Sequence, residues 1–324
     1  MKIRTTIVLA ACAAALAATP AWAQFKPVKP VEFIVHTGPG GGADVLARFI
    51  AQTIEKEKLA PVRFTVNNKT GGGGLTAMAY VAEKKGDTHA IAVFTGNWLT
   101  NPLTRAEAKF TIKDLTPVAR LVLEPALIAV KGDAPFKTLK DFIDEAKKHP
   151  KTLKQSGGST TSRDNVVRQL LMKATGADWA FISFPGGGER IAALLGGHVN
   201  MMVVEPQEAG EHIKAGNMRV IAQVSDTRLA GYPHVPTIKE AGYDITNVPQ
   251  VRGIVMPPGV APDVVAYYED LFLRLSKTPT WKKYLEEQQF EDGYMKSAEV
   301  AKFFEVFSNQ MRDILKEAGV KVLR

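Results

Sequence analysis

Short apolar runs alternate along the chain with longer segments in which apolar residues recur at helical spacing. The run at 31–36 predicts a buried strand, and runs at 63–66 and 90–95 predict two more. The segments 43–57 and 74–84 between them predict helices. The first predicted helix has one apolar face, made of Val45, Leu46, Phe49, Ile50 and Ile54. This β-α-β-α-β order predicts a parallel sheet with helices on both faces.

The same alternation returns in the middle of the chain. Strands are predicted there at 126–131, 154–156, 180–184, 200–204 and 219–224. Helices are predicted between them, and Thr138 with Asp141 forms the T-x-x-D pattern that begins one of these helices. Two α/β units of similar build are therefore expected in tandem.

The C-terminal quarter differs, with one strand at 252–256 and then only helices. Pro257-Pro258-Gly259 ends the strand, and Pro262 suits the first turn of a helix. Two later helices have strongly apolar faces, made of Trp281, Tyr284 and Leu285 and of Val300, Phe303, Phe304, Phe307, Met311, Ile314 and Leu315. Such faces need a sheet to cover, so we expect the chain to return to its first unit. The expected domains are 24–125 plus 250–324, and 126–249 with the crossover segment, with a cleft between them.

Residues 1–23 have the pattern of a cleaved secretory signal peptide. Lys2 and Arg4 precede an apolar run at 7–18, and Ala21-Trp22-Ala23 is an A-x-A cleavage site that leaves Gln24 first. The run is too short for a spanning helix, which needs about 20 apolar residues. An alternative interpretation is a lipoprotein lipobox, Leu9-Ala10-Ala11-Cys12, with Cys12 lipidated. We expect the mature chain to be exported and soluble.

Composition narrows the classes of function. Cys12 is the only cysteine, so a mature chain that starts at Gln24 has none. A disulfide framework, a thiol nucleophile and a Cys-ligated metal are then excluded. The formal net charge is +8, of which Lys2 and Arg4 supply two, and the other Lys and Arg are dispersed. Nucleic acid is therefore not expected as a partner, whereas a mild positive field favours small anions.

Four glycine-rich turns follow predicted strands, at 37–44, 70–74, 157–161 and 185–188. Glycine lets the backbone approach a ligand closely. Free backbone N–H groups at the start of a helix favour an anion such as a carboxylate or a phosphate. In open α/β sheets, ligands bind at the carboxyl ends of the strands, where these turns lie. The alternative to ligand binding is a purely structural role, in which the glycines only make tight turns.

Two enzyme interpretations compete with an anion-binding cleft. Gly38-x-Gly40-x-x-Ala43 matches a dinucleotide fingerprint, but Asn67-Asn68 stands where an acid should bind the ribose. The sequence of the 157–161 turn resembles the G-x-S-x-G nucleophile elbow, with Ser159 at its centre, but Thr161 replaces the last glycine. The histidines available for a triad are His198, His212 and His234, all in polar surroundings. No Walker A, H-E-x-x-H or EF-hand motif is present, and no metal or other cofactor is expected.

Five segments in order resemble the substrate-binding proteins of tripartite tricarboxylate transporters, the Bug or TctC-like family. They are 39–48 (PGGGADVLAR), 68–74 (NKTGGGG), 187–199, 233–242 (PHVPTIKEAG) and the Arg252-Gly253 to Pro258-Gly259 stretch. The resemblance implies two doubly wound α/β domains with a hinge and an interdomain cleft, as in type II periplasmic binding proteins. It also implies a monomer in the periplasm that is not an enzyme and delivers a di- or tricarboxylate to membrane subunits of such a transporter.

The resemblance also implies where the ligand binds. The expected residues of the first domain are Thr37, Gly40, Gly41, Gly42, Ala43, Asp44, Thr95 and Asn97. Those of the second domain are Ser159, Thr160, Thr161, Arg163, Gly186, Gly187 and Glu205. A guanidinium at Arg163 suits a distal carboxylate, and Glu205 follows a strand, although an exposed arginine and a solvated acid are ordinary alternatives.

The sequence departs from the family pattern in the second-domain wall of the expected cleft and just before the strand predicted at 252–256. Thr161-Ser162 replaces a common Gly-Gly, Phe184-Pro185 replaces Tyr-Lys, and Gln250-Val251 replaces Asn-Trp. The ligand therefore stays open between citrate, a C4–C6 dicarboxylate and an aromatic dicarboxylate. Two other functions also stay open: an exported serine hydrolase using Ser159, and a sensor that presents the same ligand to a signalling receptor.

Overall fold

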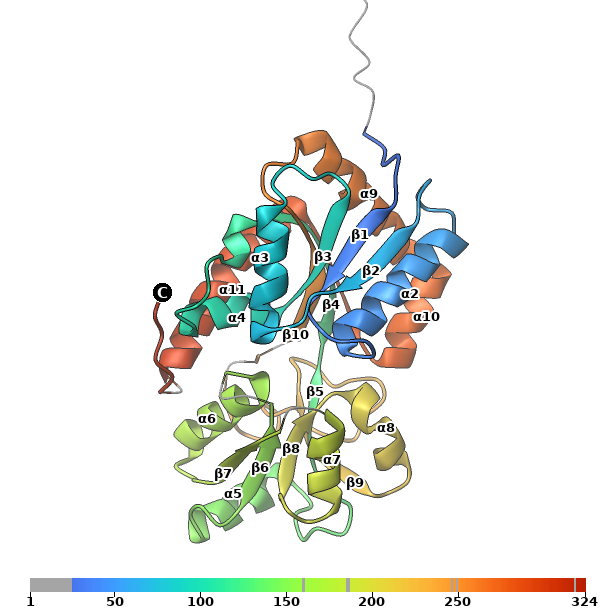
Figure 1. Cartoon of the computed structure of the whole chain (residues 1–324). Helices are drawn as coiled ribbons and strands as arrows, with labels where there is room; N and C mark the ends of the chain where they lie inside the picture. Colours follow the sequence, from blue (N-terminus) through green and yellow to red (C-terminus); the bar gives the residue numbers. More distant parts are fainter. Residues whose placement is uncertain (1–24, 159–160, 185–186, 246, 249, 318) are drawn as a thin grey trace, which may run out of the picture.

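Two β-sheets, each flanked by helices, form two units joined through the middle of the chain (Figure 1). This computed structural model describes residues 25–158, 161–184, 187–245, 247–248, 250–317 and 319–324. The predicted signal peptide and the lipobox at Cys12 lie outside the described residues. The predicted fold class, with two α/β units, is confirmed.

The first unit has a six-stranded sheet. Its strands are β1 (Val31–Val35), β2 (Phe64–Asn68), β3 (Ala90–Thr95), β4 (Thr116–Glu124), β10 (Gln250–Met256) and β11 (Glu291–Lys296), in the order β11-β4-β10-β3-β1-β2. β1 pairs in parallel with β2 and β3, as predicted. β10 runs antiparallel to β3 and β4, and β11 antiparallel to β4. The parallel sheet predicted from β1, β2 and β3 is therefore only part of a mixed sheet, because β10 and β11 return to it in the reverse direction.

Helices cover both faces of this sheet. They are α2 (Gly42–Lys56), α3 (Leu75–Glu83), α4 (Gly96–Thr104), α9 (Pro262–Lys277), α10 (Pro279–Gln288) and α11 (Ser297–Glu317). Successive residues of a strand point to opposite faces. Phe33 accordingly packs with the side chains of α2, α9 and α10. Ile34 packs with those of α3, α4 and α11. The C-terminal helices thus cover the first sheet, as their apolar faces predict.

The second unit has a five-stranded sheet. Its strands are β5 (Ala126–Lys131), β6 (Lys154–Gly157), β7 (Ala180–Ser183), β8 (Met201–Val204) and β9 (Met218–Val224), in the order β7-β6-β8-β5-β9. Its helices are α5 (Leu139–Lys148), α6 (Arg163–Thr175), α7 (Gly187–Leu195) and α8 (Pro206–Lys214). β6 runs parallel to β7 and β8, whereas β5 runs antiparallel to β8 and β9. The predicted start of α5 is confirmed by a complete Thr138–Asp141 capping box.

Four features differ from the sequence pattern or were missed by it. β4 is mostly apolar but is interrupted by Pro117 and Arg120, and β11 is largely charged, so neither shows a clear period of two. α4 begins at Gly96 and contains Pro102, two residues that disfavour helices. Val45 was assigned to the buried face of α2 but is 44% exposed, because it lies in the first turn of the helix beside a pocket.

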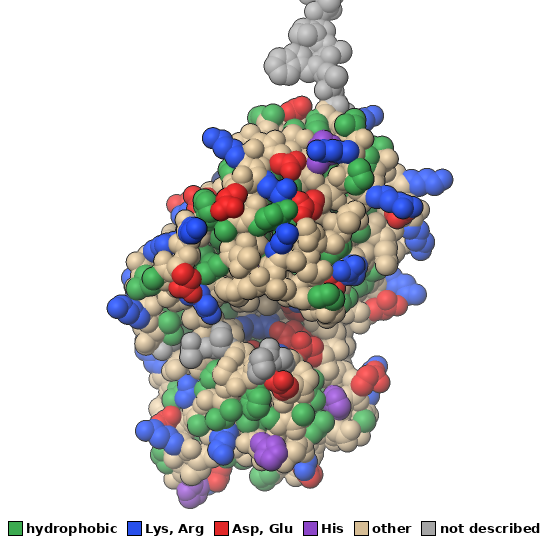
Figure 2. Space-filling model, in the orientation of Figure 1, with side chains coloured by type: hydrophobic (Ala, Val, Ile, Leu, Met, Phe, Trp, Pro, Cys, Tyr) green, Lys and Arg blue, Asp and Glu red, His purple; other side chains and the backbone are tan. Residues whose placement is uncertain are grey.

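The two units contact each other closely on one side. One buried apolar cluster contains Phe304 of α11 and Phe142 of α5, and so extends across both units. On the same side, Lys173 of α6 pairs with Glu317 of α11 at 2.5 Å. Figure 1 places α6 and α11 on one side of the molecule and α8 and α10 on the other. In Figure 2 the surface is hollowed between the units, with acidic and basic side chains gathered there.

Candidate functional site

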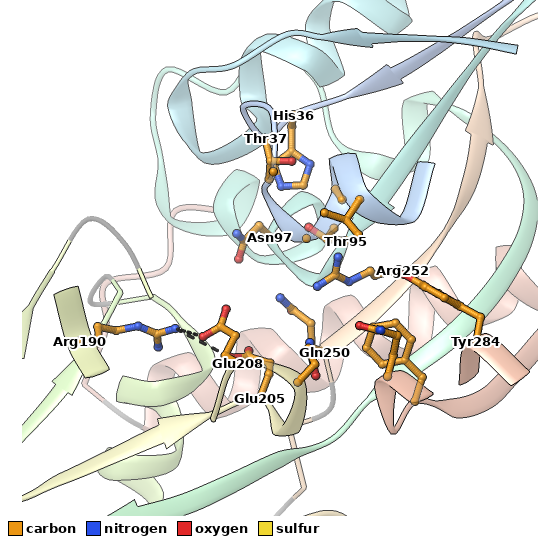
Figure 3. A pocket seen from close by; sticks show the side chains of 17 residues that line it. His36, Thr37, Thr95, Asn97, Arg190, Glu205, Glu208, Gln250, Arg252 and Tyr284 are labelled. Carbon is orange, nitrogen blue, oxygen red and sulfur yellow. Dashed lines mark hydrogen bonds and ion pairs between the residues drawn. The ribbon is translucent and has the colours of Figure 1, made fainter. Parts of the chain in front are cut away.

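A pocket of about 500 Å³ lies between the two units (Figure 3). The first unit lines it with His36, Thr37, Gly40, Gly42, Ala43, Val45, Thr95, Asn97, Gln250, Arg252, Tyr284, Gln288 and Phe290. The second unit lines it with Arg190, Glu205, Gln207 and Glu208. A smaller pocket of about 160 Å³ adjoins it and shares Asn97, Arg190, Glu205 and Gln250. Both units therefore form the larger pocket.

The turn before α2 supplies one wall of the pocket. Asp44 holds this turn, because its carboxylate accepts a hydrogen bond from the Gly40 amide at 2.9 Å and its own amide donates to Thr37 Oγ1 at 3.2 Å. Hydrogen bonds from Arg48, and further ones from Asn68, lower the pKa of Asp44 to about 2. The first amides of a helix have no partner within the helix, so those of Gly42 and Ala43 are available to an anion.

Arg252 lies against the start of α2. Its Nε and Nη2 donate to Glu124 Oε2 at 3.1 and 2.7 Å, and Glu124 is fully buried at the end of β4. A Cβ atom added to Gly42 would lie 2.6 Å from both terminal nitrogens of Arg252, so a larger residue there would displace the guanidinium. Within the described residues, Arg252 Nη1 has no hydrogen-bond partner. We call the amides of Gly42 and Ala43, together with Arg252 Nη1, the positive seat, because all of them favour an anion.

Two further polar groups of this wall are buried without a partner among the described residues, His36 Nδ1 and Thr95 Oγ1. The His36 ring packs edge-on against Trp98, with ring centroids 6.0 Å apart. Burial, with the neighbouring Arg252 charge, lowers the pKa of His36 to about 4. His36 is therefore neutral near pH 7, and the positive charge on this wall comes from Arg252.

The second-unit wall is a network of ion pairs. Arg163 donates to the Glu124 carbonyl at 2.7 Å and to Glu205 Oε1 at 2.5 Å. Arg190 pairs with Asp164 at 3.1 Å and with Glu208 at 3.2 Å, the second contact being drawn in Figure 3. Both guanidinium groups are thus already neutralised by protein carboxylates.

Two glutamates of this wall have shifted pKa values in opposite directions. Burial, and then the nearby Glu205 carboxylate, raises the pKa of Glu208 to about 7. Burial also acts to raise the pKa of Glu205, but Arg163 and Arg190 outweigh it, and the pKa is lowered. Glu205 is therefore ionised at neutral pH, and Glu208 titrates there.

The structure brings some predicted site residues together and places others elsewhere. The larger pocket is lined by Thr37, Gly40, Gly42, Ala43, Thr95, Asn97 and Glu205, and the smaller one by Arg163 and Gly187. Gly41 and Asp44 lie in the turn without lining either pocket. Thr161 Oγ1 lies 3.4 Å from Asn101 Oδ1. Ser159, Thr160 and Gly186 lie outside the described residues.

Several lining residues were not predicted from the sequence: His36, Val45, Arg190, Gln207, Glu208, Gln250, Arg252, Tyr284, Gln288 and Phe290. Arg252 stands in the Arg-Gly segment of the family resemblance, which was the one available signal for it. Tyr284 was assigned to the apolar face of a helix. It stacks on Phe49 with centroids 3.7 Å apart and also reaches the pocket.

The two enzyme interpretations gain no support. Asn68, where a dinucleotide site needs an acid, donates to the Thr37 carbonyl and to Asp44 and so fixes the turn. Ser159 lies outside the described residues. None of His198, His212 and His234 lines either pocket. Within the described part of the chain, no helix is both long and apolar enough to span a bilayer.

Comparisons with a family model and with known sequences point to the same protein family. A family model described as the tripartite tricarboxylate transporter family receptor matches residues 46–320. A Cupriavidus necator protein, described as a UPF0065 protein in the gbd 5′ region, is 30% identical over 320 residues, covering 98% of this chain and 96% of its own. BugT of Bordetella pertussis is 27% identical and covers 76% of each chain.

Solved structures agree with the fold. A TctC solute-binding protein from Polaromonas, solved without ligand, superposes with a TM-score of 0.75 at 27% identity and covers 90% of this chain and 100% of its own. An R. palustris protein solved with adipate superposes with a TM-score of 0.82 at 23% identity and covers 91% and 98%. At that identity the second likeness concerns the fold alone.

Proposed function

Because the chain belongs to the tripartite tricarboxylate transporter receptor family, we propose that it is a periplasmic solute-binding protein for a small organic carboxylate. It would be exported by the cleaved signal peptide 1–23, work as a monomer, and deliver its ligand to the membrane subunits of a tripartite transporter. It breaks no bond in that ligand. The candidate ligands are citrate, C4–C6 dicarboxylates and aromatic dicarboxylates.

The positive seat at the start of α2 is the observation that carries this proposal. Free amides at a helix N-terminus favour an anion, and a guanidinium beside them adds a charged donor that suits a carboxylate. Arg252 is fixed there by buried Glu124, and Gly42 leaves room for it. Both groups belong to the first unit, which would therefore hold the carboxylate by itself.

We propose that residues 24–125 with 250–324, and residues 126–249, are the two bodies that close on the ligand. The ligand would touch the first body through the α2 turn and the second through Glu205 and its neighbours. Only contacts made in the closed state shift the open–closed equilibrium, so binding and closure are coupled.

A thermal-shift screen of the chain from Gln24 onward, over carboxylates of different length, tests the proposal. A ligand that binds only the folded state at about 100 times its Kd stabilises it by about 2.7 kcal/mol, which raises the melting temperature. A screen in which no carboxylate raises it would overturn the proposal.

Gly42→Ala tests the location of the seat. Its Cβ meets the Arg252 guanidinium, so we expect affinity to fall about tenfold or more, which corresponds to about 1.4 kcal/mol. Gly38→Ala is the matched control, since a Cβ there meets nothing within 4 Å. Equal affinities in the two variants would place the carboxylate elsewhere.

A further inference from the structure

Gln289, the residue after α10, makes a contact between the two units that is separate from the one at α6 and α11. Its neighbours Gln288 and Phe290 line the larger pocket, whereas Gln289 does not. A Cβ atom added to Gly231 of the second unit would lie 2.6 Å from Gln289 Oε1 and 3.4 Å from its Nε2. The side-chain amide of Gln289 therefore packs directly on the backbone of Gly231, an approach that glycine permits.

The segment around Gly231 is fixed to the second unit by Gln223 of β9, which is fully buried. Gln223 Nε2 donates to the carbonyls of Tyr232 and Val235 at 2.9 and 2.6 Å. Gln223 Oε1 accepts a hydrogen bond from the Leu229 amide at 2.8 Å. Residues 229–235 should therefore move together with the second unit.

Two pKa shifts agree that the segment after α10 lies beside the segment after β9. Burial raises the pKa of Tyr232, and the polar side chain of Gln289 acts in the opposite direction. Burial, and then the carboxylate of Asp226, raises the pKa of Glu291 at the start of β11. The contact between the units thus extends beyond the single Gln289–Gly231 pair.

The backbone of Gln289 has a conformation that favours glycine. Its φ of 54° and ψ of 38° lie in the left-handed region. Its amide donates to the Glu286 carbonyl at 3.1 Å, and the Phe290 amide donates to the Leu285 carbonyl at 2.8 Å. The same two hydrogen bonds end α7, α8 and α11, where the residue in this place is Gly197, Gly216 and Gly319. At the end of α10, a side chain that reaches the other unit stands where glycine would be less strained.

We infer that Gln289, Gly231 and Tyr232 form an interunit clasp that stabilises the closed state of the pocket. The inference rests on the proposed function, in which the two bodies close on a carboxylate. Gln289 belongs to one body and Gly231 to the other, so their contact is lost when the bodies separate. Gln289 is then a positioning residue that raises affinity without lining the pocket, because apparent affinity follows the population of the closed state.

Gln289→Gly tests the clasp, because it removes the side chain and relieves the backbone at the same time. The probe is whichever of citrate, succinate, adipate and terephthalate binds the native chain most tightly in calorimetry. We expect its Kd to rise about three- to tenfold, the range for one polar contact. The urea midpoint should stay at or above that of the native chain, since glycine suits this backbone.

Lys58→Gly is the matched control. Lys58 follows α2 with the same two hydrogen bonds and a φ of 52°, but its side chain is exposed. This variant should keep both the native Kd and at least the native urea midpoint. An unchanged Kd in Gln289→Gly would overturn the inference. So would a lower urea midpoint together with the weaker binding, because that result indicates a role in helix capping alone.

Fluorescence energy transfer measures the distance between the units without any added carboxylate. A chain that starts at Gln24 has no cysteine, so Glu211→Cys on α8 and Lys283→Cys on α10 provide the only two labelling sites. Their native side chains are 88% and 74% exposed. We expect Gln289→Gly in this background to shift the distances to longer values, and Lys58→Gly to leave them unchanged. Identical distances in Gln289→Gly and its parent would overturn the inference and leave the proposed function standing. Failure of all four carboxylates to bind would overturn the proposed function, and the distances would still decide whether the clasp exists.

Discussion

Arg252 links the stability of the protein to its candidate site. Its partner Glu124 is fully buried, and the pair joins β10 to the last residue of β4. Sequence reasoning found the glycines of the α2 turn, because glycine-rich turns after strands are visible in a single sequence. It missed Arg252, Glu208 and Gln207, because nothing local distinguishes a charged residue that faces a cleft from one that faces solvent.

Arg252→Gln should lower the free energy of unfolding by about 3–5 kcal/mol, because the buried Glu124 carboxylate loses its cation. Arg63→Gln is the matched control, because its pair with Glu55 is exposed and the substitution should change the free energy by less than about 1 kcal/mol. Chemical denaturation of both variants measures the difference. Similar losses in the two would show that the buried pair contributes no more than a surface one.

Glu208→Gln should alter how stability depends on pH. The folded-state pKa of Glu208, about 7, lies above its ordinary value. The unfolded chain therefore releases this proton at lower pH, and the stabilisation from the protonated side chain is lost as pH rises through about 7. Between about pH 5 and about pH 8, the melting temperature of Glu208→Gln should therefore rise relative to that of the native chain. A difference that stays constant over this pH range would count against the raised pKa.

At the scale of elements, apolar periodicity predicted the buried strands and the amphipathic helices well. α5 and α11 were recognisable because a capping pattern or a long apolar stripe lies within one segment. β4 and β11 were not, because their places are fixed by pairing with strands far away in the sequence. The direction of β10, and hence the mixed sheet, also depends on long-range pairing that no local pattern contains.

The α5 cap gives a prediction at this scale. Thr138 accepts a hydrogen bond from the Asp141 amide, and Asp141 in turn accepts one from the Thr138 amide. Thr138→Ala should lower the free energy of unfolding by about 1 kcal/mol. Thr138→Ser, which keeps the hydroxyl, should lose far less, and urea denaturation compares them. Equal losses would mean that the cap contributes little.

At the scale of the whole molecule, the contact side and the pocket side lie on opposite edges. The apolar cluster and the Lys173–Glu317 pair join the units near α6 and α11, and the pocket lies toward α8 and α10. This asymmetry favours opening and closing on the pocket side, with the chain crossings acting as the hinge.

Small-angle X-ray scattering should detect that closure. We expect the radius of gyration to fall when a ligand found by the thermal-shift screen saturates the native chain. Gly42→Ala at the same ligand concentration should show a smaller change. An unchanged radius at full saturation would argue against closure.

The central claim is that a carboxylate binds in the pocket between the units. A crystal structure of the mature chain with its tightest carboxylate ligand tests this most directly. The account predicts one carboxylate within hydrogen-bonding distance of the Gly42 or Ala43 amide and of Arg252, with the rest of the ligand toward Glu205 and Glu208. A ligand bound outside this pocket, or one with its carboxylate against Glu205, would contradict it.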